Sequence, residues 1–483
     1  MALHKTKLNP LLGTALLFLG SFCVLVWSAP ADPPEDKADR VPANPLQLEG
    51  KFQHAYMRMQ ERYIDRIQSS RMMFSGFREV LSLPGLETLT YGDLVAPTDR
   101  TGNMKEDFET FRSAFGKIRP LLGPEADLNS LVSAMVRGMV NALRKPPYDD
   151  GYSAYLEPSR NKELHRYLKG EAASFGGIGV ELDFKQGACR IIRPIPDTPA
   201  YRGGLQPGDS ITQVDGVEVP SQDDALDRLK GDAGTPVVLT IQREGVPEHL
   251  TYKLVREIIH PQPELEKIML TDTVGYVRLN SFNETSGKEL LHNLRYLDGR
   301  GMKSCILDLR QNSGGLLTAA VEIADVFLPR GSPVVTTQGR RESDNKSYST
   351  ERNLPFTRIP LIILVDGQTA SAAEIVTGAI RDNRRGKTIG MKTFGKGTVQ
   401  EVIPLSDGSA LKLTVARYYT PSGEMIDKKG INPDYLVPLD PKKMINPAGF
   451  QDTSKVELAV VALDLQLRKA LELFGVPIPR SDF

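Results

Sequence analysis

The chain has 483 residues, 40% of them hydrophobic, so it can bury several cores at roughly 150 residues per domain. Lysine plus arginine and aspartate plus glutamate each number 60, so no net charge favours nucleic acid as a partner. The three cysteines are far apart, and no Cys/His cluster has ligand spacing. The sequence therefore predicts no disulfide framework, no metal site and no cofactor.

Residues 1–31 have the order of an export signal. Lys5 and Lys7 come first, an apolar run follows over residues 11–27, and small residues up to Ala31 precede an acidic, proline-rich stretch. The alternative is an uncleaved membrane anchor, because the run of 17 residues is close to the ~20 that span a bilayer. We expect cleavage near Ala31, and hence an exported protein that is periplasmic, or membrane-associated and facing the periplasm. Residues 32–50 are then a linker.

Residues 51–170 are predicted to form a helical N-terminal domain. Apolar residues recur at helical spacing over Phe52–Gln68 and Leu128–Leu143. Between these stretches, turn-forming residues around Pro84 and Pro97 break the pattern, so the sequence predicts no clear element there. The expected role is packing, and the apolar helical faces could also join copies of the chain into a homo-oligomer.

Residues 171–258 change to short β-rich runs between Gly, Pro and Asp turns, with one helical run predicted at 223–230, and this pattern predicts a small β-barrel. Glycines in the stretch 176–179 can point successive N–H groups into one concavity and so bind a terminal carboxylate, although a simple turn is an equal alternative. With the motifs at 200–211 and 214–219, the region resembles a PDZ domain. That resemblance implies binding of free peptide C-termini, beside an edge strand that can pair with the peptide. The predicted peptide-binding residues are Gly176, Gly177, Ile178, Gly179 and Val180.

Residues 259–441 alternate between strand and helix patterns, which predicts an α/β layer. The predicted strands are Val274–Leu279, Cys305–Leu309 and Leu361–Val365, and the predicted helices are Gly287–Leu297, Leu317–Phe327 and Ala372–Asp382. In such sheets the loops after the strands line one rim, where ligands bind. Residues 442–483 form a predicted C-terminal helical segment, because apolar residues have helical spacing over Val456–Leu473.

Ser371 is a candidate nucleophile in a part of the chain without histidine, since the last of the six histidines is His292. A local Ser-His-Asp triad is therefore not expected. Ser371 and Glu374 also fit the capping box of a helix start, which would be a purely structural role. Both roles can coexist, because the N–H of Ala372 at a helix start suits a developing oxyanion.

Lys396 is the candidate base for this serine. A lysine acts as a base near neutral pH only if its pKa falls from about 10.4 to about 7 or 8, which burial can achieve. Phe394 and Val399 would allow an apolar cleft wall around the amine; the alternative is a solvated loop lysine. Gln400 could hold the amine through a hydrogen bond.

Gly314 and Gly315 follow the strand predicted at 305–309, where their backbone could approach a substrate carbonyl and supply a second oxyanion donor. The alternative is a plain strand-to-helix turn. These glycines with Leu307–Arg310, the Thr369–Ala372 turn and the motif at 393–400 resemble those of the C-terminal processing peptidases, which are carboxy-terminal processing serine proteases with a PDZ domain. The resemblance extends over about residues 128–438.

This resemblance implies a multidomain α+β protein with a crotonase-like α/β protease domain at 259–441. It implies Ser371 as nucleophile, Lys396 as general base and Gln400 as the residue that positions the lysine. The implied oxyanion hole consists of N–H groups of Ala372 and of Gly314 or Gly315. The implied substrates are envelope proteins or peptides with free, apolar C-termini.

Three further features qualify this comparison. Asp149–Leu156 also has a counterpart in the family, and no role is assigned to it. Ser313 stands where the family usually has proline, and Asp366 where asparagine is common. Both differences bear on how rigid these two loops are.

A non-catalytic PDZ scaffold is the alternative function. A trypsin-like protease would need a catalytic domain with histidine before the PDZ domain, where the sequence predicts helices.

Overall fold

The computed structural model describes residues 24–26, 45–86, 88–95, 103–122, 127–171, 175–185, 188–195, 198–206, 208–219, 225, 228–259, 265–439, 443–445, 458–461 and 463–478. Most of the predicted signal and linker lies outside these residues. One compact unit spans residues 172–262, and a second joins the chain before this region to the chain after it. The helical segment and the predicted protease region thus form one unit. No helix within the described ranges is long and apolar enough to cross a bilayer.

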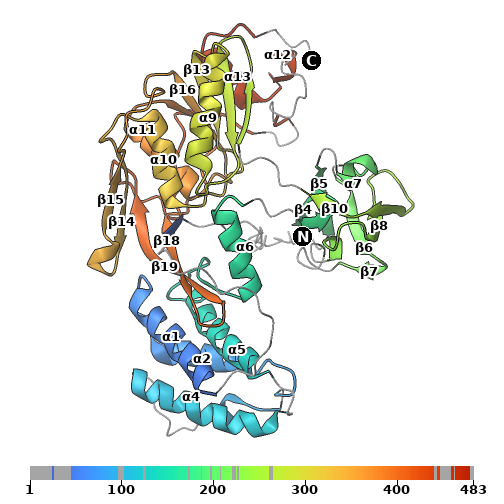
Figure 1. Ribbon diagram of the computed structural model, residues 1–483, viewed down its shortest axis with the longest axis vertical. Coiled ribbons are helices and arrows are strands. Elements are labelled where there is room, and N and C mark those ends of the chain that lie inside the picture. The colour runs from blue at the N-terminus through green and yellow to red at the C-terminus, as the bar shows by residue number, and fades with distance from the viewer. Residues whose placement is uncertain are drawn as a thin grey trace, which may run out of the picture. The chain divides into compact units, whose positions relative to one another are not determined.

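The centre of the larger unit is a mostly parallel sheet (Figure 1). Its strands, in spatial order, are β11 (Leu265–Met269), β12 (Val274–Leu279), β13 (Ser304–Asp308), β16 (Leu361–Val365), β17 (Lys387–Gly390) and β20 (Tyr435–Leu436). Only β11 pairs antiparallel to its neighbour. Every residue of β12, β13 and β16 is buried, as expected for parallel strands that are covered on both faces.

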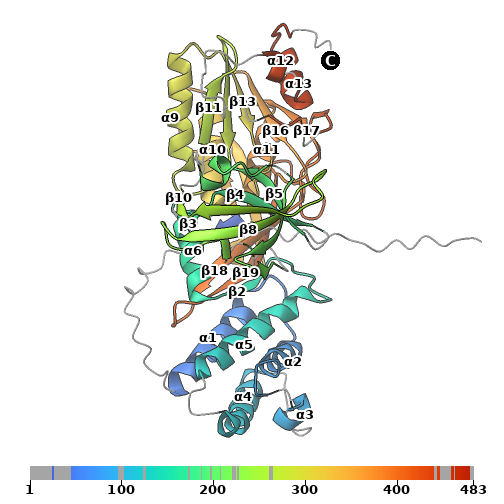
Figure 2. The same cartoon turned by 90° about the vertical axis from the view of Figure 1, so that its right-hand side faces the viewer.

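Helices cover both faces of this sheet. Because successive side chains of a strand point to opposite faces, Leu307 and Ile363 pack into one core, whereas Ile306 and Leu364 pack into another. Figure 2 shows α9 on one side of the sheet and α13 on the other. The helices are α9 (Ser286–Gly299), α10 (Leu317–Phe327) and α11 (Ala372–Asp382) for the first core, and α12 (Leu458–Val461) and α13 (Leu465–Leu473) for the second.

The predicted strands and helices of this sheet are present, with ends within two residues of those expected. The single helical run predicted over Val456–Leu473 is wrong, because the structure has two helices there. Asp464 separates them: its side chain accepts hydrogen bonds from the N–H groups of Gln466 and Leu467 and so caps the start of α13.

A second sheet contains the strands that follow the candidate base. In spatial order it contains β1 (Val24–Val26), β18 (Thr398–Pro404), β19 (Ala410–Tyr419), β14 (Pro333–Gly339) and β15 (Lys346–Ser349), and β2 (Ala154–Leu156) also pairs with β19. The β2–β19 pairing joins a segment that precedes residues 172–262 to the strands that follow Lys396.

The helical segment packs against the β18–β19 hairpin (Figure 1). Its helices are α1 (Pro45–Arg62), α2 (Ser69–Val80), α3 (Tyr91–Leu94), α4 (Met104–Ile118), α5 (Leu128–Asn141) and α6 (Pro158–Leu168). Lys51, which is buried, forms an ion pair with Asp407 in the hairpin turn. The helix predicted to continue to Gln68 ends at Arg62, because the N–H of Ile64 donates to the carbonyl of Thr414 in β19.

The smaller unit is an antiparallel sheet with a core of its own. Its strands are β4 (Val180–Lys185), β5 (Ala188–Pro194), β6 (Ser210–Val214), β8 (Pro236–Gln242) and β9 (Leu250–Val255), with β7 (Val217–Glu218) beside β6; a separate pair joins β3 (Phe175–Gly177) to β10 (Glu257–Ile259), and α7 spans Pro199–Arg202. Alternate residues of β8 are buried, which fits a sheet with one solvated face. Half of the residues of the helix predicted at 223–230 lie outside the described residues.

A buried ion network ties α13 to the sheet and gives a stability prediction. Arg310 is 1% exposed and pairs with Asp308 and Asp464, each at 2.6 Å. Removing one partner of a buried pair typically costs about 3–5 kcal/mol. We expect Asp464→Ala to lower the free energy of unfolding in urea by that amount. Glu472→Ala breaks two partly exposed pairs in the same helix, with Arg468 and Lys469, and should cost less than about 1 kcal/mol. Equal losses in the two variants would contradict this account.

Candidate active site

Three adjacent parallel strands bring the predicted site residues to one edge of the sheet. β13 leads into the loop with Gly314 and Gly315, β16 leads into the turn at Ser371, and β17 leads into the loop with Lys396. The carboxyl ends of neighbouring parallel strands share an edge, so residues far apart in sequence meet there. The rim expected from the strand–loop–helix pattern is therefore present.

Asp366 connects the first two of these loops. Its Oδ1 accepts hydrogen bonds from the N–H of Gln311 at 3.0 Å and from the N–H of Thr369 at 3.0 Å. The Thr369 hydroxyl in turn donates to the carbonyl of Leu309 at 2.9 Å. The aspartate that departs from the family pattern thus accepts hydrogen bonds from both loops.

Ser371 has a strained backbone at the turn between β16 and α11. Its φ of 63° and ψ of −121° lie in a region that costs a non-glycine residue on the order of 1–3 kcal/mol. The Ser371 Oγ is buried and has no hydrogen-bond partner among the described residues. In the predicted capping box, only the Glu374 carboxylate acts, since it accepts from the Ser371 N–H at 2.9 Å. The predicted capping-box arrangement is thus present, with the hydrogen bond to the glutamate formed and the serine hydroxyl left without one.

Gly314 lies directly against this serine. A methyl group built on Gly314 would be 2.7 Å from the Ser371 Cβ and 2.8 Å from the Ala372 nitrogen, so only glycine fits. The N–H of Gly314 already donates to Asn312 Oδ1 at 2.8 Å. Within the described part of the chain, the N–H groups of Gly315 and Ala372 donate to no acceptor. Of the two predicted glycines, Gly315 is thus the one whose backbone N–H is available to a substrate carbonyl.

Glu374 links the serine to the loop of the lysine. Its Oε2 accepts from the N–H of Ser371 and from the N–H of Lys396, both at 2.9 Å. Its Oε1 accepts from the Thr393 hydroxyl at 2.5 Å and from the N–H of Gly395 at 2.8 Å. The side chain is fully buried, and this burial raises the pKa of the Glu374 carboxyl, while the four donors counteract the rise.

Tyr418 on β19 makes a second link between the same two loops. Its hydroxyl faces the carbonyl oxygen of Ser371 at 3.1 Å and also the carbonyl oxygen of Lys396, and it can donate its hydrogen to either. Burial raises the pKa of Tyr418, and the nearby carboxylate of Glu374 raises it further. The phenol therefore stays protonated and remains a donor.

Lys396 is 3% exposed, which excludes a solvated loop lysine. Its Nζ lies 4.4 Å from the centroid of the Tyr152 ring. The predicted wall residue Phe394 is 57% exposed, so the expectation that it helps to bury the lysine is wrong. Phe394 instead points outward from the loop, and Val399 is buried as the sequence suggests.

Gln400 is fully buried at the third position of β18. Its Nε2 donates to the hydroxyl oxygens of Thr398 at 2.9 Å and of Thr414 at 3.2 Å. Its Oε1 is buried without a hydrogen-bond partner in the described residues. Because buried polar atoms are nearly always paired, this oxygen and the Ser371 Oγ stand out as unused groups.

The predicted peptide-binding residues separate into two groups in the smaller unit. Gly176 and Gly177 belong to β3 and pair with β10, and Ile178 is buried in the core of this unit. Gly179, with a φ of 76°, precedes β4, which begins at Val180 and is the terminal strand of its sheet. The predicted edge strand is therefore present among the described strands.

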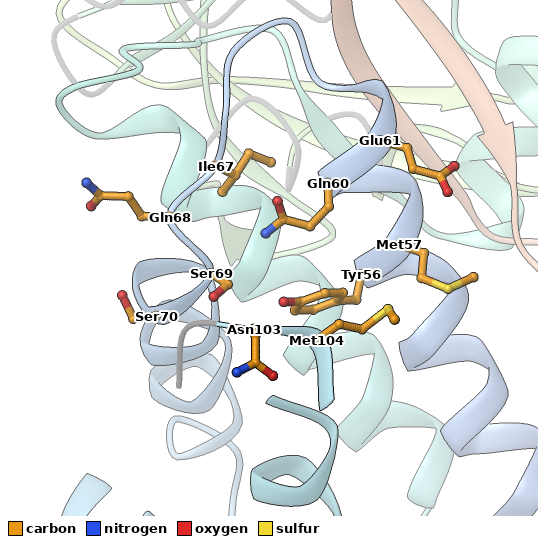
Figure 3. A pocket seen from close by; sticks show the side chains of 10 residues that line it. All are labelled: Tyr56, Met57, Gln60, Glu61, Ile67, Gln68, Ser69, Ser70, Asn103 and Met104. Carbon is orange, nitrogen blue, oxygen red and sulfur yellow. The ribbon is translucent and has the colours of Figure 1, made fainter. Parts of the chain in front are cut away.

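A separate pocket of about 610 Å³ lies in the helical segment (Figure 3). It is lined by Tyr56, Met57, Gln60, Glu61, Ile67, Gln68, Ser69, Ser70, Asn103 and Met104. These side chains include two serines but no lysine, arginine or histidine. The pocket therefore has no counterpart of the buried lysine at the edge of the sheet.

A buried serine and a buried lysine lie on the loops that follow two neighbouring parallel strands, which points to a serine protease as the class of protein. The sequence matches peptidase family S41 over residues 273–437 and the PDZ domain over residues 190–243. A carboxy-terminal-processing protease of Bartonella bacilliformis is 36% identical over 346 residues, which are 70% of this chain and 77% of that protein. The carboxy-terminal processing protease CtpA of Bacillus subtilis is 34% identical over 335 residues, 69% of each chain.

Among solved structures, a photosystem II D1 C-terminal processing protease is similar, with a TM-score of 0.53 and 28% identity over 85% of this chain and 96% of that one. The chain therefore belongs to peptidase family S41, among the carboxy-terminal processing proteases, and is a serine-type protease that carries a PDZ domain.

Three residues of the site were not found as site residues from the sequence. Glu374 was recognised only as part of a helix capping box, and Tyr418 gave no signal. Tyr152 lies in the segment Asp149–Leu156, whose resemblance to the family was noted without a role. Their contacts with Lys396 join residues that are distant in sequence, so no local pattern could reveal these contacts.

Glu374 offers a test of how the two loops are held. In Glu374→Gln an amide nitrogen replaces one acceptor oxygen and faces two donors, each of which costs about 1–3 kcal/mol when buried unpaired. We expect the free energy of unfolding to fall by about 2 kcal/mol or more, measured in urea. Thr393→Ser keeps both the hydroxyl donor to Glu374 and the acceptor for the N–H of Ile431, and it should cost less. A Glu374→Gln protein as stable as the unmodified chain would show that the carboxylate does not hold the loops.

Proposed function

We propose that this protein is an exported serine endopeptidase that uses a Ser371/Lys396 dyad and recognises protein C-termini through its PDZ domain. One observation carries the proposal: Lys396 is almost fully buried, and its backbone N–H shares the Glu374 carboxylate with the N–H of Ser371. Burial favours the neutral amine, and only the neutral amine can accept a proton. A crotonase-like core, built from the parallel sheet and its helices, is part of this proposal.

In the proposed reaction, the neutral Lys396 amine accepts the hydroxyl proton of Ser371 as Oγ attacks the scissile carbonyl. The N–H groups of Ala372 and Gly315 stabilise the negative charge on the carbonyl oxygen, and the loss of one such donor typically costs about a hundred- to a thousandfold in rate. The Lys396 ammonium then protonates the leaving amine. Water hydrolyses the remaining acyl ester in the reverse sequence of proton transfers and restores the free Ser371 hydroxyl.

The unpartnered atoms of the site fit this scheme. The Ser371 Oγ makes no hydrogen bond in the described residues, and we propose that it forms one to Lys396 when substrate binds, since catalytic hydrogen bonds are often completed only in the substrate complex. The free Oε1 of Gln400 is an acceptor for the ammonium that forms during attack. The amide of Gln400 is fixed by its two threonine partners and can therefore keep that oxygen in place.

We propose that substrates bind as extended strands. The edge strand β4 can take the C-terminal residues of a substrate, since PDZ domains bind peptides by strand addition. At the protease site, β18 accepts the short strand β1 in parallel on its outer edge, with Leu25 opposite Gln400. That edge is thus able to pair with an extended segment close to Lys396.

The export and the envelope substrates rest on residues 1–31 and on the family resemblance. Cleavage near Ala31 would release the protein into the periplasm, and an uncleaved run at 11–27 would hold it at the membrane. The alternative of a non-catalytic PDZ scaffold is less well supported, because a scaffold has no need for a buried lysine beside a strained serine.

The dyad predicts two inactive variants. Ser371→Ala removes the nucleophile but keeps the Cβ and the turn, and it should lower the cleavage of a denatured test protein at least about a thousandfold. Lys396→Met keeps an apolar stem and removes the amine, and it should lower the rate at least about a hundredfold. Lys392→Ala, an exposed lysine of the same loop, is the control and should retain full activity. Full activity in either dyad variant would end the proposal.

The PDZ domain predicts dependence on the substrate's C-terminus. A test protein that ends in apolar residues should be cleaved at least about tenfold faster at low concentration than one that ends in aspartates, because an apolar side chain gains about 1–3 kcal/mol on burial. Amidation of the apolar terminus removes the carboxylate and should slow cleavage similarly. Initial rates measured by mass spectrometry provide the test, and equal rates for all three substrates would exclude recognition of C-termini.

A further inference from the structure

The segment Asp149–Leu156 comes before the PDZ domain, yet it reaches the protease site. We propose that Tyr152 is a positioning residue for Lys396: its ring excludes water from the amine, and a turn built on Asp150 and Ser153 holds the ring in place. This inference rests on the proposed function, because it assigns a role to Tyr152 in preparing the base.

The turn around Tyr152 is fixed by a single carboxylate. Asp150 Oδ1 accepts from the N–H of Tyr152 at 2.8 Å and from the N–H of Ser153 at 3.2 Å, and Asp150 Oδ2 accepts from the Ser153 hydroxyl at 2.6 Å. Asp150 and Ser153 are both buried. β2 follows at once and pairs with β19, where Ala154 lies opposite Lys412. The backbone on both sides of Tyr152 is therefore held.

The same turn also reaches Gln400. The N–H of Thr414 donates to Ser153 Oγ at 3.0 Å, and the hydroxyl oxygen of Thr414 accepts from Gln400 Nε2 at 3.2 Å. The register of β18 against β19 shifts between Val399 and Gln400, so the regular ladder is interrupted beside this contact. One turn thus contacts the candidate base through Tyr152 and supports Gln400 through Thr414.

Two effects of the ring on the amine oppose each other. A cation over an aromatic face is stabilised, which raises the pKa of a lysine by about 0.5 to 1.5. Loss of water lowers the pKa of a buried lysine by up to about 3 to 5. Because Lys396 is 3% exposed with the ring centroid 4.4 Å from its Nζ, we infer that exclusion of water is the larger effect. Removing the ring should then raise the pKa of Lys396.

Other groups near Lys396 also influence its titration. Glu374 at the start of α11 accepts its backbone N–H, and Tyr418 on β19 faces its carbonyl. Asp427, in the segment after β19, accepts the N–H of the neighbouring Gly397 at 3.2 Å. Variants of Tyr152 leave these three groups in place. The phenol of Tyr152 also raises the pKa of Tyr418, so Tyr152→Phe is needed to separate the effect of the hydroxyl from that of the ring.

The test is the pH dependence of kcat/KM for the full chain. In the proposed mechanism kcat/KM rises with pH as the base loses its proton. Tyr152→Ala should move this rise to higher pH by about one pH unit or more and lower kcat/KM at pH 7 about tenfold or more. Tyr152→Phe keeps the ring and should leave the rise where it is. Tyr155→Ala, which alters a tyrosine on β2, is the control for general loosening and should not move the rise.

If kcat/KM of Tyr152→Ala rises at the same pH as that of the unmodified chain, the inference is overturned even if activity falls. A merely structural role lowers the rate without shifting the pH profile. A Tyr152→Phe profile that matches Tyr152→Ala would overturn it too, since the hydroxyl would then be the active group. If Tyr152→Ala does not fold, Ser153→Ala replaces it: loosening the turn should shift the rise in the same direction and lower kcat severalfold, with KM within about twofold. If Ser371→Ala is inactive and the pH profile of Tyr152→Ala is unchanged, only this inference is rejected. If Ser371→Ala is active, the proposed function itself is rejected.

Discussion

The carboxylate of Glu374 accepts four hydrogen bonds, and two of them come from the backbone N–H groups of Ser371 and Lys396. The remaining structure of the site depends on this arrangement. Ser371 begins a helix after β16, whereas Lys396 ends a loop after β17, and the carboxylate fixes the spacing between their backbones. The Tyr418 hydroxyl repeats the link from the carbonyl side. Because all these groups are buried, the two side chains have little freedom other than their own rotations.

The same arrangement explains the strained turn at Ser371. A residue with a positive φ persists only where its surroundings hold it, and here the Glu374 carboxylate holds the Ser371 N–H while Gly314 packs against its Cβ. At this turn the Ser371 hydroxyl makes no hydrogen bond within the described residues. A structural and a catalytic role were both open from the sequence. The capping contact is made by the glutamate, which leaves the serine hydroxyl unused.

Much of this architecture follows from local patterns. The continuous apolar runs of β13 and β16, and the helical spacing of α10 and α11, predict the parallel sheet, and the sheet in turn predicts that Ser371 and Gly314 share an edge. What surrounds Lys396 could not be predicted in this way. Phe394 is next to the lysine in sequence but points outward, while Tyr152, from before the PDZ domain, covers it through the β2–β19 pairing. Contacts between residues so distant have no periodic signal in one sequence.

Burial of Lys396 is the claim on which the chemistry depends, and the titration of its amine tests that claim most directly. In the Ser371→Ala chain, with lysine labelled by ¹⁵N at Nζ, the Lys396 signal can be followed by NMR from pH 5 to pH 11 and assigned by its loss in Lys396→Met. The account predicts a midpoint below about 8, where a free lysine would titrate near about 10.4. A midpoint near the value of a free lysine would contradict it, since the amine would then be protonated at neutral pH and could not take a proton from Ser371.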